Sequence, residues 1–298
     1  MKVIIFNVEH GFCAFVRSPN GCGLMIDCGC TDTFSPVKFL LKYERDSLKP
    51  VIQGTKTYLL TKLIISHPHD DHVQDIENII KHFEPSKLQR RGGFVWEEIK
   101  RAGSGKDYAN LDMYSNWQTK YKGEAAPIDW GGMSVKVGPS LSIDQAKALG
   151  EADFVNNTSI PVFLEYGGIK FAFPGDLMES GWKKLLQDDS FRANLAGTNV
   201  FIASHHGHTS GFCAEAFKVM GNPNVCVISA HKRDESVDPR YSSSDFVKGI
   251  MLNGEPRYRL TTRYDGSIIF LYVNSQSWQI DLLNLAEKMN PPDNRGLF

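Results

Sequence analysis

Several common features are missing from this sequence of 298 residues. It has no apolar run of the ~18–20 residues that cross a bilayer, and the stretch from Met1 to Val8 reads as a strand, not as a signal peptide. Its 33 basic and 34 acidic side chains leave a formal charge of −1, which argues against binding nucleic acid through a field over the whole surface. We therefore expect no membrane association, and any anion binding should be local.

The six cysteines also lack a pairing pattern. They include no Cys-x-x-Cys pair and no spacing typical of a structural zinc site. Cys28 and Cys30 flank a glycine, but two thiolates are only half of a closed tetrahedral site. With no secretion signal, the pattern predicts reduced, mostly buried thiols in a cytoplasmic protein.

The chain does contain many short apolar runs that are closed by turn residues. Runs typical of strands cover residues 3–6, 13–16, 24–26, 63–65, 161–165, 169–173, 200–203, 225–229, 257–260, 267–273 and 278–282. Apolar spacing typical of helices covers residues 76–83, 182–186, 214–220 and 246–252. This predicts one α/β domain over residues 1–285, with an insertion at about 86–150 and a frayed tail over 286–298.

The segment from Ser86 to Gly123 differs in composition from the rest. Its eight Lys and Arg against four Asp and Glu give a local charge of +4, and six aromatic residues are interleaved with them. One interpretation is a surface insertion whose rings form a small separate core. The other is a substrate-binding lid, in which cations such as Arg90 and Arg91 contact phosphates and rings stack on bases.

The most informative stretch is His67-Pro-His69-Asp-Asp71-His72. A packed loop gains nothing from burying so many polar groups without a cation. Histidines two apart at a strand end can point the same way, while Asp71 and His72 at the following helix start can face a second point. Nitrogen and carboxylate ligands suit zinc, with manganese or iron as alternatives. The stretch therefore predicts two divalent metal ions held side by side.

This stretch matches the His-x-His-x-Asp-His signature, and the chain resembles the metallo-β-lactamase superfamily. Met25–Gly29, Phe173–Asp176 and Ser204–Gly207 match further motifs in the same order. The resemblance implies an αββα four-layer sandwich, in which two mixed β-sheets are flanked by helices. It also implies that Asp176 bridges the ions, that a late histidine is a ligand and that Asp27 orients a ligand histidine.

More narrowly, the chain resembles the soluble hydrolase domain of ComEC-type DNA-uptake proteins over about residues 2–274. The motifs that carry this resemblance lie at 7–11, 157–159, 205–210, 228–229 and 258–266. Asn157 and Ser159 are either plain loop residues or substrate contacts, and His10 and His208 are candidates for lining the cleft. The first turn departs from the usual Asp-Val-Gly-Gln-Gly-Asp, because it reads Asn7-Val-Glu-His-Gly-Phe12 and lacks both acids.

No histidine lies between His82 and His205, where lactamase-type relatives place the third histidine of the first ion. His205, His206, Asp176 or a water could complete the coordination shell of the first ion in its place. Adjacent residues at a strand end point in opposite directions, so we expect one of the pair on the metals, with His205 as the first choice.

The remaining histidines and one acid then divide the catalytic roles. The histidine of the group His205, His206 and His208 that binds no metal is the expected donor of a proton to the leaving oxygen. Asp71 is expected to orient the attacking hydroxide as well as to bind metal. His206 and His208 are therefore the catalytic candidates beside Asp71.

We therefore predict a metal-dependent hydrolase of the dinuclear zinc type that cleaves phosphodiester bonds in nucleic acid or nucleotides through a metal-bound hydroxide. Hydrolysis of esters, lactones or thioesters is the alternative, because the same ions serve acyl chemistry. A regulatory module that acts only within a larger assembly is the third interpretation. A basic lid favours phosphates, and an apolar lid favours acyl substrates.

Overall fold

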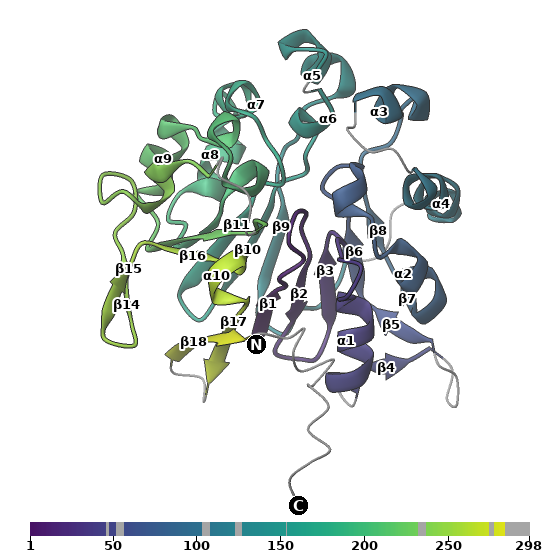
Figure 1. Cartoon of the computed structure of the whole chain (residues 1–298), viewed down its shortest axis with the longest axis horizontal. Helices are drawn as coiled ribbons and strands as arrows, with labels where there is room; N and C mark the ends of the chain where they lie inside the picture. The colour runs from purple at the N-terminus through teal and green to yellow at the C-terminus, as the bar shows by residue number, and fades with distance from the viewer. Residues whose placement is uncertain are drawn as a thin grey trace, which may run out of the picture.

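The structure is a computed structural model that describes residues 1–45, 48–51, 57–102, 108–122, 127–152, 154–231, 237–273 and 277–283 (Figure 1). The expected C-terminal tail lies outside these ranges. All six cysteines lie inside them and are free thiols, four of them buried. Within the described ranges, no helix has the length and apolarity that a bilayer-spanning segment requires.

The first of two large sheets has seven strands in the order β18-β17-β1-β2-β3-β6-β8. Its members are β1 (Lys2–Ile5), β2 (Ala14–Arg17), β3 (Gly23–Ile26), β6 (Lys62–Ile64), β8 (Leu88–Gln89), β17 (Ser267–Val273) and β18 (Ser277–Leu283). The strands from β18 to β3 pair antiparallel, whereas β6 runs parallel to both β3 and β8. The sheet is therefore mixed.

The second large sheet has six strands in the order β16-β13-β12-β11-β10-β9. Its members are β9 (Ser134–Val137), β10 (Val162–Tyr166), β11 (Ile169–Phe173), β12 (Val200–Ile202), β13 (Val225–Ile228) and β16 (Arg259–Thr261). The four strands from β11 to β16 are parallel, and β10 pairs antiparallel with β11 and β9. The predicted insertion at 86–150 thus contains β9, an edge strand of this sheet.

Alternation along the strands divides the apolar residues between two cores. In β1, Val3 and Ile5 belong to a cluster that includes Phe171 and Val227 of the second sheet. Ile4 belongs instead to a cluster that contains residues of the flanking helices. Because the two sheets share one core and each is also covered on its outer side, the layers are helix, sheet, sheet and helix.

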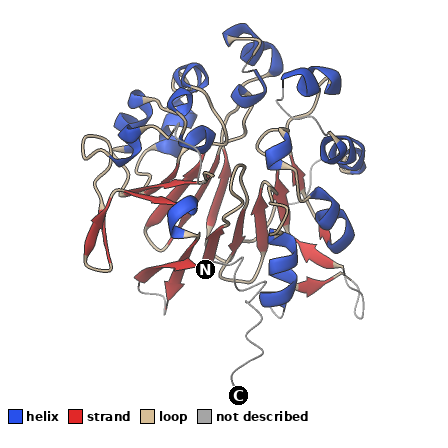
Figure 2. Ribbon diagram, in the orientation of Figure 1, coloured by secondary structure: helices blue, strands red, loops and turns tan. Residues whose placement is uncertain are grey.

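The helices and smaller sheets complete the outer layers, as Figure 2 shows. The helices are α1 (Pro36–Tyr43), α2 (Ile76–His82), α3 (Trp96–Ala102), α4 (Ala109–Trp117), α5 (Ile143–Leu149), α6 (Phe154–Asn157), α7 (Glu179–Leu185), α8 (Asp189–Leu195), α9 (Ala214–Met220) and α10 (Thr262–Asp265). The short strands are β4 (Lys49–Pro50), β5 (Tyr58–Leu60), β7 (Phe83–Pro85), β14 (Ile250–Leu252) and β15 (Glu255–Arg257). The expected αββα sandwich is confirmed.

One predicted helix is wrong. Residues 246–252 do not form a helix, because β14 pairs antiparallel with β15 as a hairpin. Asn253 and Gly254 both have positive φ at its turn. Such a turn joins two antiparallel strands, and apolar spacing alone did not distinguish this hairpin from a helical turn.

Candidate metal centre

The site is built where several strands end at one edge of the sandwich. Asp27 follows β3, His67 follows β6 within three residues, Asp176 follows β11, and His205 and His206 follow β12. These strands run parallel to a neighbour within their own sheets, so polar groups placed after them gather at the same edge. The fold thus brings polar side chains from separate sequence motifs close together at this edge.

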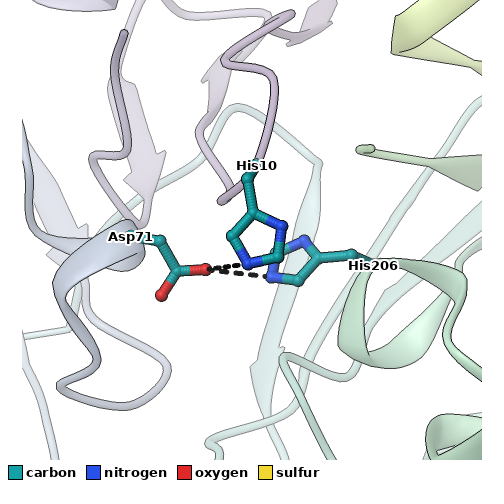
Figure 3. A group of neighbouring side chains, drawn as sticks. All are labelled: His10, Asp71 and His206. Atoms are coloured by element: carbon teal, nitrogen blue, oxygen red, sulfur yellow. Dashed lines mark ion pairs between the residues drawn. The ribbon is translucent and has the colours of Figure 1, made fainter. Parts of the chain in front are cut away.

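Asp71, Asp176 and His206 form the centre of the site. His206 Nε2 lies 3.2 Å from Asp71 Oδ2 and 3.2 Å from Asp176 Oδ2. Figure 3 shows the His10 and His206 rings turned toward the same oxygen of Asp71 from two different elements. His10 Nε2 lies 3.6 Å from that oxygen. Asp71, His10 and His206 therefore form one group of closely spaced donor atoms that could hold a cation.

A second group consists of His67, His72 and Asp176. His72 Nε2 lies 3.4 Å from Asp176 Oδ2, and His67 Nε2 lies 3.9 Å from the same oxygen. His67 Nε2 is also 3.2 Å from His69 Nδ1. Because Asp176 touches His206 of the first group as well, the two groups adjoin and share a carboxylate between them.

Asp27 and Ser66 orient the histidines of the second group. A carboxylate only accepts hydrogen bonds, so the 2.8 Å contact means that His72 Nδ1 donates to Asp27 Oδ2. The Ser66 hydroxyl donates to the same oxygen over 2.7 Å, which leaves Ser66 Oγ to accept from His67 Nδ1 over 3.1 Å. Both rings therefore carry hydrogen on Nδ1, and each presents the lone pair of Nε2 to the site.

Two glycines hold the backbone of Asp71 in place. A Cβ on Gly29 would lie 2.5 Å from the carbonyl oxygen of Asp71, and a Cβ on Gly11 would lie 2.4 Å from the same atom. Gly11 also has φ 110°, where side chains are rarely tolerated. The glycine that ends the Asp27-Cys-Gly29 motif is thus needed for close approach to the loop that carries Asp71.

The structure places His206, not His205, between the two carboxylates. The expectation for His205 assumed that the strand continues and that side chains alternate. Instead both residues adopt left-handed backbone conformations, with φ of 51° and 54°, in a tight turn after β12. His205 lines the adjoining cavity, and its Nδ1 lies 3.0 Å from Ser210 Oγ. The local turn therefore brings His206, instead of the expected His205, close to both carboxylates.

The electrostatics of the cluster favour bound positive charge. Burial alone would disfavour ionisation of Asp176, but the neighbouring His206 and His72 hold its pKa well below the usual range. Burial alone would lower the pKa of His206, yet Asp176 and Asp71 raise it to about 10. Two ionised carboxylates in a buried site thus need compensating cations.

The remaining predicted residues take other positions. Asn157 is fully buried, accepts a hydrogen bond from the amide of Met178 and donates to Ser180, while Ser159 Oγ accepts from the amide of Asp176. Both therefore support the Asp176 loop rather than line the cavity. His208 Nδ1 lies 2.7 Å from Ser210 Oγ, so Ser210 lies between His205 and His208.

Arg90 and Arg91 do not face the site. Arg90 donates to the side chain of Gln118 and to the carbonyl of Tyr121, and Arg91 donates to Ser140 Oγ. Neither belongs to the residues that line the cavity. Their guanidinium groups hydrogen-bond within the insertion. The structure therefore differs from the predicted lid, in which these two cations face phosphates of the substrate.

A cavity of about 340 Å³ adjoins the cluster. Its polar side contains His10, His69, Asp70, Asp71, Gln74, Asn156, Asp176, His205 and His206. The insertion contributes Ile99, Tyr108 and Leu111, which form an apolar wall with one phenol. The insertion therefore does border the site, as a lid would, but with apolar groups and an aromatic ring instead of cations.

Sequence reasoning missed Asn156. It precedes the two motif residues Asn157 and Ser159, yet it is the one of the three that lines the cavity. Its side-chain Oδ1 is buried and has no hydrogen-bond partner among the described residues. The run of Asn156-Asn157-Thr-Ser159 after the insertion was the available signal.

The donor set fits divalent metal ions. His69 Nε2, His72 Nε2 and His206 Nε2 are buried, and none makes a well-directed hydrogen bond within the described part of the chain. Buried polar atoms are normally satisfied, so buried nitrogens without hydrogen bonds, two of which lie beside the carboxylates of Asp71 and Asp176, suit a cation as their partner. Imidazole and carboxylate are ligands that zinc, manganese and iron accept.

No protein-family model matches the chain. ComE operon protein 3 of Bacillus subtilis (strain 168) is 25% identical over 285 residues, which cover 92% of this chain and 33% of that protein. The chain thus spans about a third of the length of the curated relative that it matches.

Solved structures with similar folds include the metallo-β-lactamase fold protein YhfI from Bacillus subtilis, with 13% identity and a TM-score of 0.45 over 94% of this chain and 98% of that one. Igni18, a metallo hydrolase from Ignicoccus hospitalis, has 16% identity and a TM-score of 0.48 over 91% of this chain and 100% of that one.

Two mixed sheets packed between helices, with a histidine and aspartate cluster at their shared edge, make this chain a metallo-β-lactamase-fold protein. Within that fold it is similar to ComE operon protein 3, so the predicted link to the ComEC-type proteins is confirmed.

Proposed function

We propose that this chain is a hydrolase that depends on two divalent metal ions, zinc being the first candidate. The observation that carries the proposal is the position of His206 Nε2, 3.2 Å from a carboxylate oxygen of both Asp71 and Asp176, beside the group of His67 and His72. Two adjoining donor groups that share Asp176 suit a pair of ions. Bound divalent ions supply Lewis-acid catalysis and the activation of water at neutral pH.

We assign different roles to the residues around the two ions. We assign His67, His69, Asp71, His72, Asp176 and His206 as ligands, with Asp27 and Ser66 fixing two of the rings. His205 faces the cavity and contacts Ser210, so it is placed to donate a hydrogen bond to a leaving oxygen. His10 is 63% exposed at the side chain and lies at the mouth, where it can contact substrate.

We propose a phosphodiester as the substrate bond. A pair of ions stabilises both the attacking and the leaving oxygen of an in-line displacement at phosphorus. The motifs that resemble those of ComEC-type DNA-uptake proteins favour nucleic acid or a nucleotide. The wall of Tyr108, Ile99 and Leu111 can pack against a base or another planar group.

One observation favours an acyl substrate as the second candidate. No Lys or Arg of the described chain lines the cavity, and the side contributed by the insertion is mainly apolar. Such a wall suits the aliphatic part of an ester, lactone or thioester. The same ions can polarise a carbonyl, so the cluster alone serves either chemistry.

The test is hydrolysis by the full chain reconstituted with Zn²⁺ or Mn²⁺. We expect turnover of a bis-aryl phosphodiester that exceeds turnover of an aryl ester and a lactone, and that is lost on chelation and in His67→Ala. Activity on the ester or lactone alone would transfer the assignment to acyl hydrolysis. No metal-dependent activity on any of the three substrates would overturn the proposed function.

A further inference from the structure

Asn156 is a buried amide that the roles assigned above leave unused. The residue is 6% exposed, and its Oδ1 has no hydrogen-bond partner among the described residues. A buried carbonyl oxygen without a partner destabilises the fold, so such an atom normally has a function or a ligand. The neighbouring residues do not share this property, because Asn157, Thr158 and Ser159 all make side-chain hydrogen bonds.

The hydrogen bond of the side-chain nitrogen of Asn156 fixes the orientation of its amide group. Asn156 Nδ2 donates to the sulfur of Met178 over 3.8 Å, and a thioether can only accept. The nitrogen therefore faces Met178, and the oxygen is the end left for another partner. The carbonyl of Asn156 accepts a hydrogen bond from the amide of Ser159, which fixes the backbone of the turn.

The short helix α6, which carries Asn156, lies between two loops of the metal centre. Just beyond α6, the amide of Ile160 donates to the carbonyl of Ser66, directly before His67. Ser159 Oγ accepts from the amide of Asp176 over 2.9 Å. Asn156 also lines the same cavity as His69 and Asp176. These hydrogen bonds connect the segment after Asn156 to the loops of His67 and Asp176, and Asn156 lines the same cavity as His69.

That side of the cluster has room for a further ligand. His67 Nε2 and His69 Nδ1 lie 3.2 Å apart, His67 shares its group of donor atoms with His72 and Asp176, and His69 Nε2 has no hydrogen-bond partner among the described residues. A neutral amide oxygen is a hard ligand, which magnesium, calcium and manganese accept more readily than soft ions do.

Resting on the proposed function, we infer that Asn156 Oδ1 is a further protein ligand, beside His67 and His69, of the ion on that side of Asp176. An oxygen in place of an imidazole weakens zinc at that position relative to manganese. The two ions therefore differ in affinity. The ion held by Asp71 and His206 binds tightly, and the ion at Asn156 exchanges and accepts Mn²⁺.

The experiment measures ion stoichiometry and affinity in the full chain. Metal-free protein is titrated with Zn²⁺ and Mn²⁺ by chelator competition, and bound Mn²⁺ is followed by electron paramagnetic resonance. We expect Asn156→Ala to lose one ion or to bind it at least tenfold more weakly. Asn156→His should raise the preference of that site for Zn²⁺ over Mn²⁺ by tenfold or more, and Asn156→Asp should tighten binding of either ion. Asn116→Ala, an exposed asparagine on α4, is the matched control and should bind like wild type.

The outcomes separate this assignment from the proposed function. Wild-type affinity for both ions in the His and Asp variants would overturn the ligand assignment, even if the Ala variant fails to fold. Unchanged ion binding in Asn156→Ala with a raised KM would also overturn it, because the amide would then contact substrate. Loss of one ion in Asn156→Ala in a protein that hydrolyses none of the three test substrates would support the assignment while overturning the proposed function.

Discussion

His72 Nδ1 lies 2.8 Å from Asp27 Oδ2, and both side chains are fully buried. Asp27 has φ 55°, a backbone conformation that aspartate adopts more readily than most residues but still at some cost. The structure keeps this conformation at the end of β3 because it turns the carboxylate toward the loop that follows β6. Asp27 therefore orients the His72 ring by a hydrogen bond, instead of contributing to the apolar core.

The first prediction concerns Asp27→Asn. An amide in place of the carboxylate can present its NH₂ group to His72, which would reverse the ring's tautomer and remove the Nε2 lone pair from the site. We expect metal affinity to fall by about 10–100-fold, the usual effect of removing such a partner. Chelator competition measures it.

Asp27→Ser is a second variant for the same contact. Its hydroxyl can accept a hydrogen bond from His72, but the shorter side chain must reach the ring to do so. Circular dichroism of the metal-free variants checks that they are folded. Wild-type affinity in folded Asp27→Asn would show that the ring needs no anchoring carboxylate.

The second prediction concerns Gly29→Ala. Its Cβ would lie 2.5 Å from the Asp71 carbonyl oxygen and 2.9 Å from that of Phe12, and backbone atoms cannot yield as a flexible side chain can. We expect a loss of about 1–3 kcal/mol in the free energy of unfolding, together with weaker metal binding because the Asp71 loop shifts. Denaturant titration and ion competition measure the two effects.

Gly92→Ala is the matched control for that substitution. A Cβ at Gly92 meets no atom within 4 Å, and its φ is not in the left-handed range. This variant should retain the stability and metal content of wild type. If Gly29→Ala behaved like Gly92→Ala, the close approach of the Asp-x-Gly motif to Asp71 would not be needed.

The third prediction separates His205 from His206. Because His206 Nε2 lies 3.2 Å from both carboxylates, His206→Ala should lose at least one bound ion and all hydrolytic activity. His205 contacts Ser210 and lines the cavity, so His205→Ala should keep both ions while kcat falls by about 10²–10⁴-fold. Elemental analysis and steady-state kinetics measure these changes; ion loss in His205→Ala would reverse the two assignments.

The sequence predicted the sandwich and the position of the cluster better than the role of each side chain. Ordered motifs after apolar strands fix which loops meet, since parallel strands end at one edge. The choice between His205 and His206 depended on a tight turn with two left-handed residues, which strand alternation does not anticipate. Asn156 was missed because an amide in a short helix carries no ligand signature until its neighbours' hydrogen bonds are known.

The partners of the two arginines could not be read from the sequence for a related reason. A basic segment rich in aromatic residues is compatible with a lid and with a self-contained insertion, and only the fold decides where a long side chain finds acceptors. Arg90 reaches Gln118 and Tyr121 of the same insertion, and Arg91 reaches Ser140. The insertion does reach the cavity, but through Ile99, Tyr108 and Leu111.

The last prediction therefore concerns Arg90→Ala together with Arg91→Ala. Each substitution removes a guanidinium that donates to groups of the insertion. We therefore expect the free energy of unfolding to fall by about 1 kcal/mol for each of the two side chains. Because neither side chain lines the cavity, a nucleic-acid substrate and a small aryl phosphodiester should be affected equally, and the salt dependence of KM should not change. Thermal denaturation and KM at several salt concentrations measure this. A raised KM and a flatter salt dependence for nucleic acid alone would instead mean that the two cations contact phosphates remote from the scissile bond.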